Sequence, residues 1–380
     1  MSKELYTRII GTGSYLPPRI IKNSYFLNHE FYEPSKVKIE GKTNEEIIEK
    51  FREITNIEER RYVSEDQVTS DIAVLAIQDA CKSAGISLDS LEFIIIGHNF
   101  GDIAFGNVRT NILPGLANKV KMKLNVKNPC CICHDIISGC PGWTQAMIVA
   151  DSYIKSGYKK RGVVVGADVL SRISDPHDRD SMIYADGAGA TIVEAVESEE
   201  PIGIIAHSSR SDSVKFANLL TLGESNNPDF NGDELFIKMS GRKLYMYAIT
   251  TVPGLVKESI EKAGLEHQTA IIGIAKRLEE IFVPGDPLTL YLDKNSSGLK
   301  MIQQIRNEAH RFGISFHRNK RSKLMLFSEL DQIKGIGPVS KNKLFLKTKD
   351  IKKIKEMSLA ELESIVGRKA GNILFNHFHL

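Results

Sequence analysis

Long apolar runs are missing from this sequence, in which the longest, such as FIIIG and GVVVGA, extend over only a few residues. A helix that crosses a bilayer needs about 20 mostly apolar residues, so no membrane span and no membrane partner are expected. The opening residues, MSKELYTRIIGTG, also lack the charged-then-apolar pattern of a signal peptide. Together these two absences predict a cytoplasmic protein.

Cysteines are few and odd in number: Cys81, Cys130, Cys131, Cys133 and Cys140. A set of this kind is not typical of a disulfide framework. One C-x-x-C pair stands beside His134, but no second pair follows, and neighbouring side chains on a strand point to opposite faces. No metal site is therefore expected there. The glycines of GTGSYLP lack the spacing of a phosphate-binding loop, which argues against nucleotide binding.

Charge is divided unevenly along the chain. Residues 271–380 hold 20 lysines and arginines against 11 acidic residues, and the rest of the chain holds 30 against 36. A basic tail on an acidic body suggests an anionic partner for the tail, nucleic acid first. A lysine-rich surface that is merely solvated explains the same count.

The first 265 residues alternate between strand and helix patterns. Residues 70–85 place Ile72, Leu75, Ala76 and Ala80 at helical spacing and end at Gly85. The expected strands lie at residues 8–17, 91–99, 161–170 and 190–195. Strands that alternate with helices predict a layered α/β/α domain.

Cys140 lies in the tight turn SGCPG, between a strand-like run and a helical pattern that starts near Trp143. Pro141 suits the first position of a helix. A thiolate at a helix N-terminus is stabilised by the helix dipole, and the same N–H groups can hold an oxyanion. Cys140 is thus a candidate nucleophile. The alternative is a buried, inert cysteine that packs as a small apolar side chain.

A family resemblance bears on this choice. From about residue 5 to 265 the chain resembles a ketoacyl-ACP synthase III, through IIGTGSYLP, REITNIEERRYV, DIISGCPGW, GVVVGADVLSR and DRDSMIYADGAGATIVEA in the order of that family. The resemblance implies a thiolase fold, a homodimer and a role in fatty acid biosynthesis. It implies that Cys140 takes an acyl group from acyl-CoA and passes it to malonyl-ACP, with acyl carrier protein as partner and no permanently bound cofactor. Asp186, Gly187 and Gly189 match a turn near the site, for which a structural role is favoured.

The second half of that family's catalytic set is missing. The family stabilises the enolate formed from malonyl with a His and an Asn that follow the EKAGL helix after a strand. Here EKAGL runs directly into EHQTAIIG, so His267 has no strand before it and no Ala-Asn after it. His267 is interpreted as a polar linker residue. The domain is expected to be truncated at its C-terminus.

The tail contains ELDQIKGIGPVSKNKLFLK, in which GIGP separates two helical patterns. Glycines there can direct N–H groups toward a phosphate at a helix N-terminus, and Lys341 and Lys343 add positive charge. Gly335, Gly337 and these lysines predict a helix–hairpin–helix module that contacts DNA phosphates without reading sequence. A shortened second hairpin, VGRKAG, is either another phosphate site or a packing partner of the first.

From about residue 270 onward the chain resembles the C-terminus of UvrC, a component of the ABC excinuclease, through IIGIAKRLEEIFVPGD, LYLDK, RNEAHRFGISFHRNKRSK and GIGP. This implies a partial ribonuclease-H-like segment and a link to nucleotide excision repair and DNA damage. His310 matches the family's metal-binding histidine. The two aspartates that complete that site lie upstream in the family and are absent here, so nuclease activity is not expected.

The predicted domains are a truncated thiolase-like synthase at 1–268, a ribonuclease-H-like segment at 269–326 and a tandem helix–hairpin–helix domain at 327–380. The leading hypothesis is an acyltransferase of the synthase III type fused to a DNA-binding tail, with both catalytic sets incomplete. A DNA-binding fragment of the repair nuclease is the second hypothesis. A gene-fusion product without full activity is the third.

Overall fold

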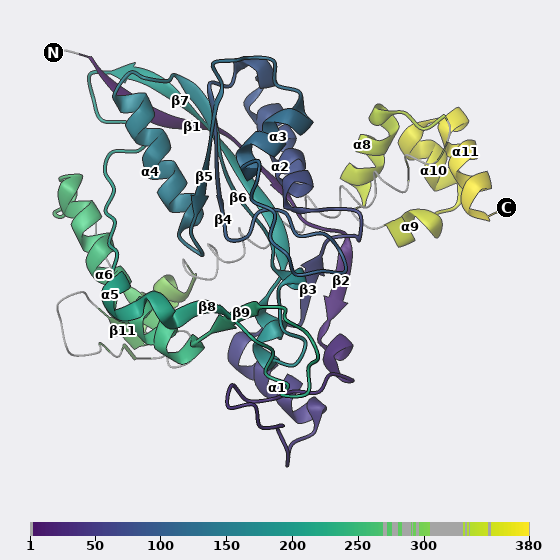
Figure 1. The fold of residues 1–380 in the computed structure, drawn as a ribbon. Helices are drawn as coiled ribbons and strands as arrows, with labels where there is room; N and C mark the ends of the chain where they lie inside the picture. Colours follow the sequence, from purple (N-terminus) through teal and green to yellow (C-terminus); the bar gives the residue numbers. More distant parts are fainter. Residues whose placement is uncertain are drawn as a thin grey trace. The chain divides into compact units, whose positions relative to one another are not determined.

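The computed structural model describes residues 3–268, 272–275, 280–282, 290, 292–293, 296–304, 330, 333, 335–348 and 351–379. The chain divides into two compact units, Met1–Ile271 and Ile272–Leu380. Figure 1 shows the elements of both units along the chain. Each unit has its own hydrophobic core and is described by itself.

Unit 1 is built on a five-stranded sheet of order β1-β7-β6-β4-β5. Its strands are β1 (Glu4–Tyr15), β4 (Phe93–His98), β5 (Ile132–Ile137), β6 (Arg161–Val169) and β7 (Asp186–Ser198). Strands β5, β4 and β6 run parallel, whereas β7 is antiparallel to β6 and to β1. The parallel part of the sheet is the part that leads into the cysteine turn.

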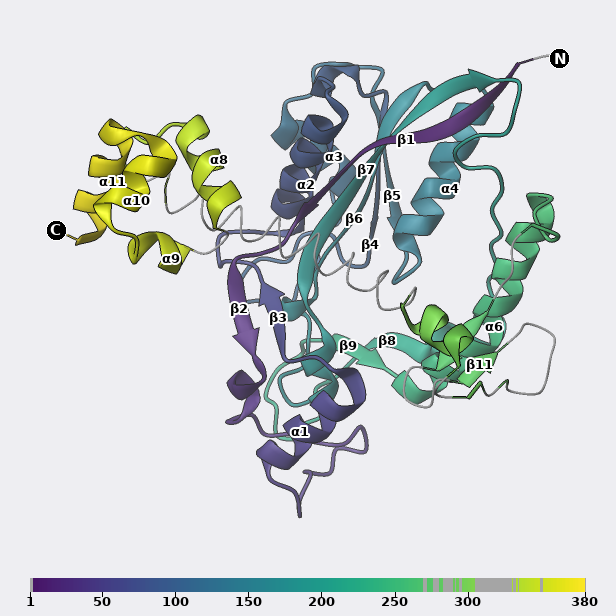
Figure 2. The same ribbon diagram turned by 180° about the vertical axis from the view of Figure 1, so that it is seen from behind.

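Helices cover both faces of this sheet, with α2 (Thr69–Ala84) and α3 (Leu116–Leu124) on one face and α4 (Gly142–Lys155) on the other (Figure 1, Figure 2). Two separate apolar clusters fill the two interfaces. Strand β4 is buried along its whole length because it has helices on both sides. Each of its large apolar side chains contributes about 1.5–3 kcal/mol by burial. The layered α/β/α prediction is confirmed.

Smaller elements surround the sheet of unit 1. Strand β2 (Arg19–Lys22) pairs with β3 (Glu59–Tyr62), and β8 (Leu220–Gly223) pairs with β9 (Phe236–Met239). Helix α1 (Asn44–Thr55) begins with a capping box between Thr43 and Glu46. The short helices are η1 (Asn23–Phe26), η2 (Leu88–Ser90), η3 (Leu170–Arg172), η4 (Arg179–Ile183), α5 (Ser213–Phe216) and η5 (Ala217–Leu219).

The last long helix of unit 1, α6 (Gly241–Lys262), is 22 residues long and buries none of them. Helix α2, which is shorter, buries eight residues against the sheet. A long helix with an apolar face normally depends on such packing for its stability.

Unit 2 contains the antiparallel pair β10 (Gly273–Ala275) and β11 (Glu280–Phe282) and helical residues 297–304. It continues with α8 (Pro338–Lys347), α9 (Ile351–Lys355), α10 (Leu359–Val366) and α11 (Arg368–His379). A core that includes Leu330, Leu344 and Leu374 joins these last helices. Within the described residues of both units, no helix is long and apolar enough to cross a membrane.

Candidate functional site

The turn that carries Cys140 joins the end of β5 to the start of α4. Ser138 N donates to His98 O at 3.1 Å, which extends the parallel pairing past the strand. Gly142 N then donates to Gly139 O at 2.8 Å and closes the turn. Cys140 is exposed at this turn. The predicted strand–turn–helix arrangement is therefore present around the cysteine.

Pro141 differs slightly from its predicted position. It is the N-cap of α4, with φ −81° and ψ 1°, and the helix begins one residue later at Gly142. Its carbonyl accepts the first bond of the helix, from Gln145 N at 2.9 Å. No side chain caps this end of the helix. The N-terminus of α4 is thus presented next to Cys140 without a competing side-chain acceptor.

Glycines allow the start of α4 to lie against the end of β4. A Cβ on Gly97 would come within 2.4 Å of the Gly142 carbonyl carbon, so no larger residue fits at Gly97 without displacing the helix. A Cβ on Gly166 would lie 3.3 Å from Trp143 Cβ. Because β4, β5 and β6 are parallel, this packing holds Cys140 at their carboxyl ends, where α/β proteins place their ligands.

Asn99 and Asp168 form a polar pair beside this turn. Asn99 N donates to Asp168 Oδ1 at 3.0 Å, and Asn99 Nδ2 donates to Asp168 Oδ2 at 2.7 Å. A Cβ on Gly139 would lie 3.5 Å from Asn99 Oδ1, so the pair borders the cysteine turn. Burial raises the pKa of Asp168 to about 6, although the bonds from Asn99 oppose the shift. The sequence analysis did not identify either residue.

Asp168 makes the stability of unit 1 depend on pH. Its folded-state pKa of about 6 exceeds the usual 3.8, so between these values the folded state holds a proton that the unfolded state has lost. The free energy of unfolding therefore decreases as the pH rises through this window, by roughly 1–2 kcal/mol after allowance for partial exposure. We expect Asp168→Asn to remove this pH-dependent part of the free energy of unfolding. Urea unfolding of both proteins near pH 4.5 and pH 7 measures it, and an identical pH dependence in both would contradict the assignment.

Tyr184 is a second residue that the sequence analysis missed. Its side chain is 8% exposed, and its hydroxyl has no hydrogen-bond partner among the described residues. Burial is the main reason that its pKa is raised, and the charges of Asp180 and Asp178 add to the shift. A buried hydroxyl without a partner is uncommon, which makes Tyr184 a candidate contact for a bound ligand. The only sequence signal was a polar side chain in an apolar stretch.

Asp186 was predicted to lie in a structural turn with Gly187 and Gly189, and the structure corrects this. All three belong to the start of β7, because Gly187 pairs with Asp168, and Gly189 pairs with Gly166 and Ser14. The Asp186 carboxylate accepts bonds from Val63 N at 2.9 Å and from the backbone and hydroxyl of Ser171 at 2.9 and 2.7 Å. Burial nevertheless raises its pKa.

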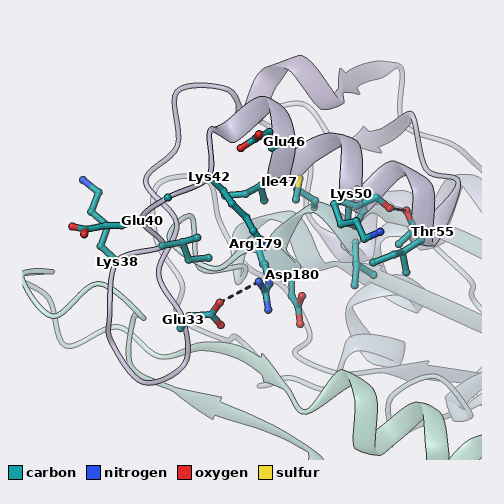
Figure 3. A pocket seen from close by; sticks show the side chains of 16 residues that line it. Glu33, Lys38, Glu40, Lys42, Glu46, Ile47, Lys50, Thr55, Arg179 and Asp180 are labelled. Atoms are coloured by element: carbon teal, nitrogen blue, oxygen red, sulfur yellow. Dashed lines mark hydrogen bonds and ion pairs between the residues drawn. The ribbon is translucent and has the colours of Figure 1, made fainter.

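A cavity of about 960 Å³ opens between α1 and η4, just before Tyr184 in the chain. Figure 3 shows Lys42, Lys50 and Arg179 among its lining side chains, with Arg179 Nη1 3.2 Å from Glu33 Oε1. Apolar side chains, including Phe51, share the wall with the carboxylates of Glu33, Glu40, Glu46 and Asp180. The cavity therefore offers cations, carboxylates and an apolar surface.

The first hairpin of unit 2 has the predicted glycine geometry. Gly335 has φ +97°, a left-handed conformation that favours glycine. Gly337 is the N-cap of α8, with Pro338 in the first turn. Lys343 is exposed, but Lys341 is only 8% exposed. The Lys341 side chain is largely covered, so Lys343 is the openly presented lysine of this hairpin, and a phosphate contact by Lys341 stays a prediction.

The second hairpin is reduced to one residue. Helix α10 begins with a capping box between Ser358 and Glu361 and ends at Gly367, which has φ +86°. Helix α11 starts directly at Arg368. Both Arg368 and Lys369 are exposed at this end of the helix. The structure thus presents two helix N-termini that follow glycines.

The two remaining predicted residues, His267 and His310, are not placed by the structure in the cysteine turn or in the hairpins. His267 is exposed in the turn that follows α6. His310 lies outside the described residues. Within the described part of the chain, no group of three His, Cys, Asp or Glu residues is placed to hold a metal ion.

Comparisons with known proteins match the two parts of the chain to two families. Residues 134–213 match the family model of 3-oxoacyl-[acyl-carrier-protein] synthase III. The beta-ketoacyl-[acyl-carrier-protein] synthase III 1 of Vibrio vulnificus is 31% identical over 304 residues, which cover 77% of this chain and 86% of that protein. The solved 3-oxoacyl-[acyl-carrier-protein] synthase III of Aquifex aeolicus superposes with a TM-score of 0.53 at 29% identity, over 68% of this chain and 72% of the other. The remaining part of the solved chain lies outside this superposition.

Residues 253–314 match the UvrC RNAse H endonuclease domain. The UvrABC system protein C of Christiangramia forsetii is 54% identical over 122 residues, which are 32% of this chain. This chain spans about a fifth of the length of that relative, since the match covers 20% of it. The endonuclease match begins inside α6, upstream of the predicted boundary at residue 268. The two similarities are consistent with a fusion.

Proposed function

Because the chain belongs to the β-ketoacyl-[acyl-carrier-protein] synthase III family, we propose that Cys140 accepts an acyl group from an acyl thioester. The observation that carries this proposal is the exposed thiol at the turn between β5 and α4. In this position an acyl donor can approach the sulfur directly. The role of Cys140 as a nucleophile is a proposal that rests on this geometry and on the family.

The proposed step is a transthioesterification. The Cys140 thiolate attacks the carbonyl carbon of acyl-CoA, and a new carbon–sulfur bond forms. The tetrahedral oxyanion is stabilised by N–H groups at the N-terminus of α4. The bond to the departing CoA sulfur then breaks, and CoA leaves as a thiolate that takes a proton from water. The product is an acyl-enzyme at Cys140.

The reaction is proposed to stop at this acyl-enzyme. Condensation with malonyl-ACP in the intact family needs a His and an Asn that stabilise the enolate. The one His near the expected place, His267, is exposed in a turn after α6, and the Ala-Asn that should follow it is missing from the sequence. Without hydrogen bonds to the developing negative charge, the decarboxylation barrier stays high.

For the donor we propose acyl-CoA, with the cavity between α1 and η4 holding its anionic portion. Lys42, Lys50 and Arg179 line this cavity and can pair with phosphates, beside the carboxylates of Glu33, Glu40, Glu46 and Asp180. Acyl carrier protein, as alternative donor, and a homodimer of unit 1 remain predictions, as does a cytoplasmic location. No permanently bound cofactor takes part in the proposed step.

Intact-mass spectrometry tests this proposal. Incubation of the full chain with acetyl-CoA is expected to add one acetyl group, and peptide mapping is expected to place it at Cys140. Longer acyl-CoA donors then define the accepted chain length. An unchanged mass with every acyl-CoA would refute the proposal.

A second candidate function is DNA binding by the helix–hairpin–helix domain, supported by the left-handed Gly335 and by Gly337 at the N-cap of α8. These N–H groups and the exposed Lys343 suit phosphate contacts without base reading. Fluorescence anisotropy with duplex DNA at rising salt tests it. Affinity is expected to fall steeply, with a log–log slope of about −0.9 per phosphate neutralised. DNA binding that does not depend on salt would contradict this function. If neither acylation of Cys140 nor DNA binding is found, the third hypothesis remains, a fusion product without full activity.

A further inference from the structure

Unit 1 contains another cavity, of about 860 Å³, between the short helices α5 and η5 and the N-terminal half of α6. Ser240 N donates to Leu219 O at 2.8 Å, and this bond ties the end of η5 to the start of α6. Both residues line the cavity. It shares no lining residue with the cavity between α1 and η4, and Cys140 is not part of its wall. The proposed acylation therefore leaves this cavity without a role.

The side chains that line this cavity carry an excess of positive charge. Asp212 is the one acidic residue among its described lining residues. Arg210 pairs with Asp212 through two bonds, Nε to Oδ2 at 2.6 Å and Nη2 to Oδ1 at 3.0 Å. Lys215, Arg242 and Lys243 also line the cavity, and none of them makes an ion pair with a described residue. Three cations without a partner suit a ligand with several negative charges, such as a chain of phosphates.

The N-terminus of α6 adds to this charge. Ser240 is the N-cap of the helix, its side chain caps no backbone N–H, and the first turn holds no acidic residue. The helix is 22 residues long, and its positive end favours an anion. Arg242 and Lys243 belong to the same first turn. Backbone and side chains thus favour an anion at the same end of the cavity.

Two aromatic rings stand in the wall beside these cations. Phe216 and Tyr247 pack with their ring centroids 4.8 Å apart and their planes at 46°. The Tyr247 hydroxyl donates to Asp212 Oδ2 at 2.9 Å, which holds that ring in place. Phe216 remains 40% exposed, so its ring is open to contact by a ligand. Aromatic rings beside cations hold a nucleobase next to its phosphates.

We propose that this cavity binds a free nucleoside polyphosphate, with its phosphates at Lys215, Arg242 and Lys243 and its base against Phe216. Each half of the cavity matches one half of such a ligand, the cations its phosphates and the rings its planar base. The volume lies within the range of about 300–1,000 Å³ that small-molecule sites occupy. The proposal is independent of acylation at Cys140, and Cys140→Ser is expected to bind the nucleotide as the wild type does.

Isothermal titration calorimetry of the full chain with ATP tests the proposal. ATP is expected to bind, and the double variant Arg242→Gln with Lys243→Gln is expected to lower the affinity by about tenfold or more, because two charge-assisted contacts are lost. Lys257→Gln is the matched control, since it makes the same change on the same helix at a lysine that pairs with Glu261 outside the cavity. Equal far-UV circular dichroism of the variants excludes loss of folding. If the wild type does not bind ATP, or the double variant binds it equally well, the proposal is wrong.

Partial ligands test whether both halves of ATP are recognised. Tripolyphosphate lacks the base and adenosine lacks the phosphates, and each is expected to bind at least about tenfold more weakly than ATP. Phe216→Leu is expected to weaken ATP by about tenfold and to leave tripolyphosphate binding unchanged. Tripolyphosphate that binds as tightly as ATP would show that the base is not recognised, and would overturn the assignment to a nucleotide.

CoA carries an adenine nucleotide as well, so it distinguishes the two sources of this chemistry. The affinity of CoA for the wild type is expected to change little in the double variant Arg242→Gln with Lys243→Gln, because the proposed donor site is the cavity between α1 and η4. If the double variant loses CoA as well as ATP, and the wild type prefers CoA, this cavity serves the acyl donor and the proposal of a free nucleotide is wrong.

Discussion

Cys140→Ser is expected to abolish acylation of the protein by acyl-CoA while leaving the fold intact. A serine hydroxyl at this position keeps the size and polarity of the turn but is far less nucleophilic than a thiol at neutral pH, and it needs an adjacent base. No such base was identified in the cysteine turn. The rate of acylation is expected to fall by roughly 100-fold or more, measured as the increase in intact mass with time.

The matched control for this variant is Cys130→Ser. Cys130 is the other exposed cysteine, whereas Cys81 and Cys131 are buried and burial raises the pKa of both thiols to about 11. A thiol of that kind is almost entirely protonated at neutral pH and is a poor nucleophile. Cys130→Ser should therefore acylate like the wild type. If the acyl adduct persists in Cys140→Ser and disappears in Cys130→Ser, the acylated residue is Cys130 and the proposal for Cys140 is wrong.

Gly337→Asp is expected to weaken DNA binding without destabilising the hairpin domain. Gly337 has φ −84° and ψ 171°, which any residue adopts, and a Cβ there meets no atom of a described residue within 4 Å. Aspartate is a favourable N-cap, so α8 is expected to gain stability. The added negative charge lies where a phosphate would bind, and affinity for duplex DNA is expected to fall by about 10- to 100-fold at low salt.

Gly337→Asn distinguishes the effect of the added negative charge on DNA binding from the effect of the added side-chain volume. Asparagine caps a helix about as well as aspartate and has nearly the same volume, but it carries no charge. It is expected to bind DNA within a few-fold of the wild type. Anisotropy titrations give the affinities, and thermal unfolding confirms that neither variant lowers the melting temperature. Equal weakening by both variants would show that the loss comes from side-chain bulk and not from phosphate repulsion.

Short-range sequence patterns were sufficient to predict the strands and helices around Cys140. The apolar run at 91–99 forms β4, and the helical spacing after residue 70 forms α2 with its end at Gly85. Helix α4 begins one residue later than predicted, with Pro141 as its N-cap, because helix ends depend on local hydrogen bonds that a sequence pattern does not resolve. The strand–turn–helix around Cys140 was predictable because it depends on short-range signals alone.

The wrong predictions and the residues that were missed all depend on contacts between residues far apart in the sequence. The glycines of ADGAGA indicate a turn when taken alone, but pairing with β1 and β6 draws them into β7. Lys341 is on the expected helix, yet its side chain is only 8% exposed. The Asn99–Asp168 pair joins residues from the ends of two different strands, and the burial of the Tyr184 hydroxyl also arises only in the fold. Proximity of this kind is not encoded in residue spacing.

The central claim is that Cys140 keeps its acylation chemistry in a chain that lacks the decarboxylating residues. The most direct measurement gives the full chain acetyl-CoA together with malonyl-acyl carrier protein radiolabelled at its free carboxyl, and follows intact mass and released CO₂ in the same sample. The account predicts an acetyl group on Cys140 and no more labelled CO₂ than Cys140→Ser releases. Labelled CO₂ formed in step with acetylation, or a Cys140 that stays unmodified, would contradict it.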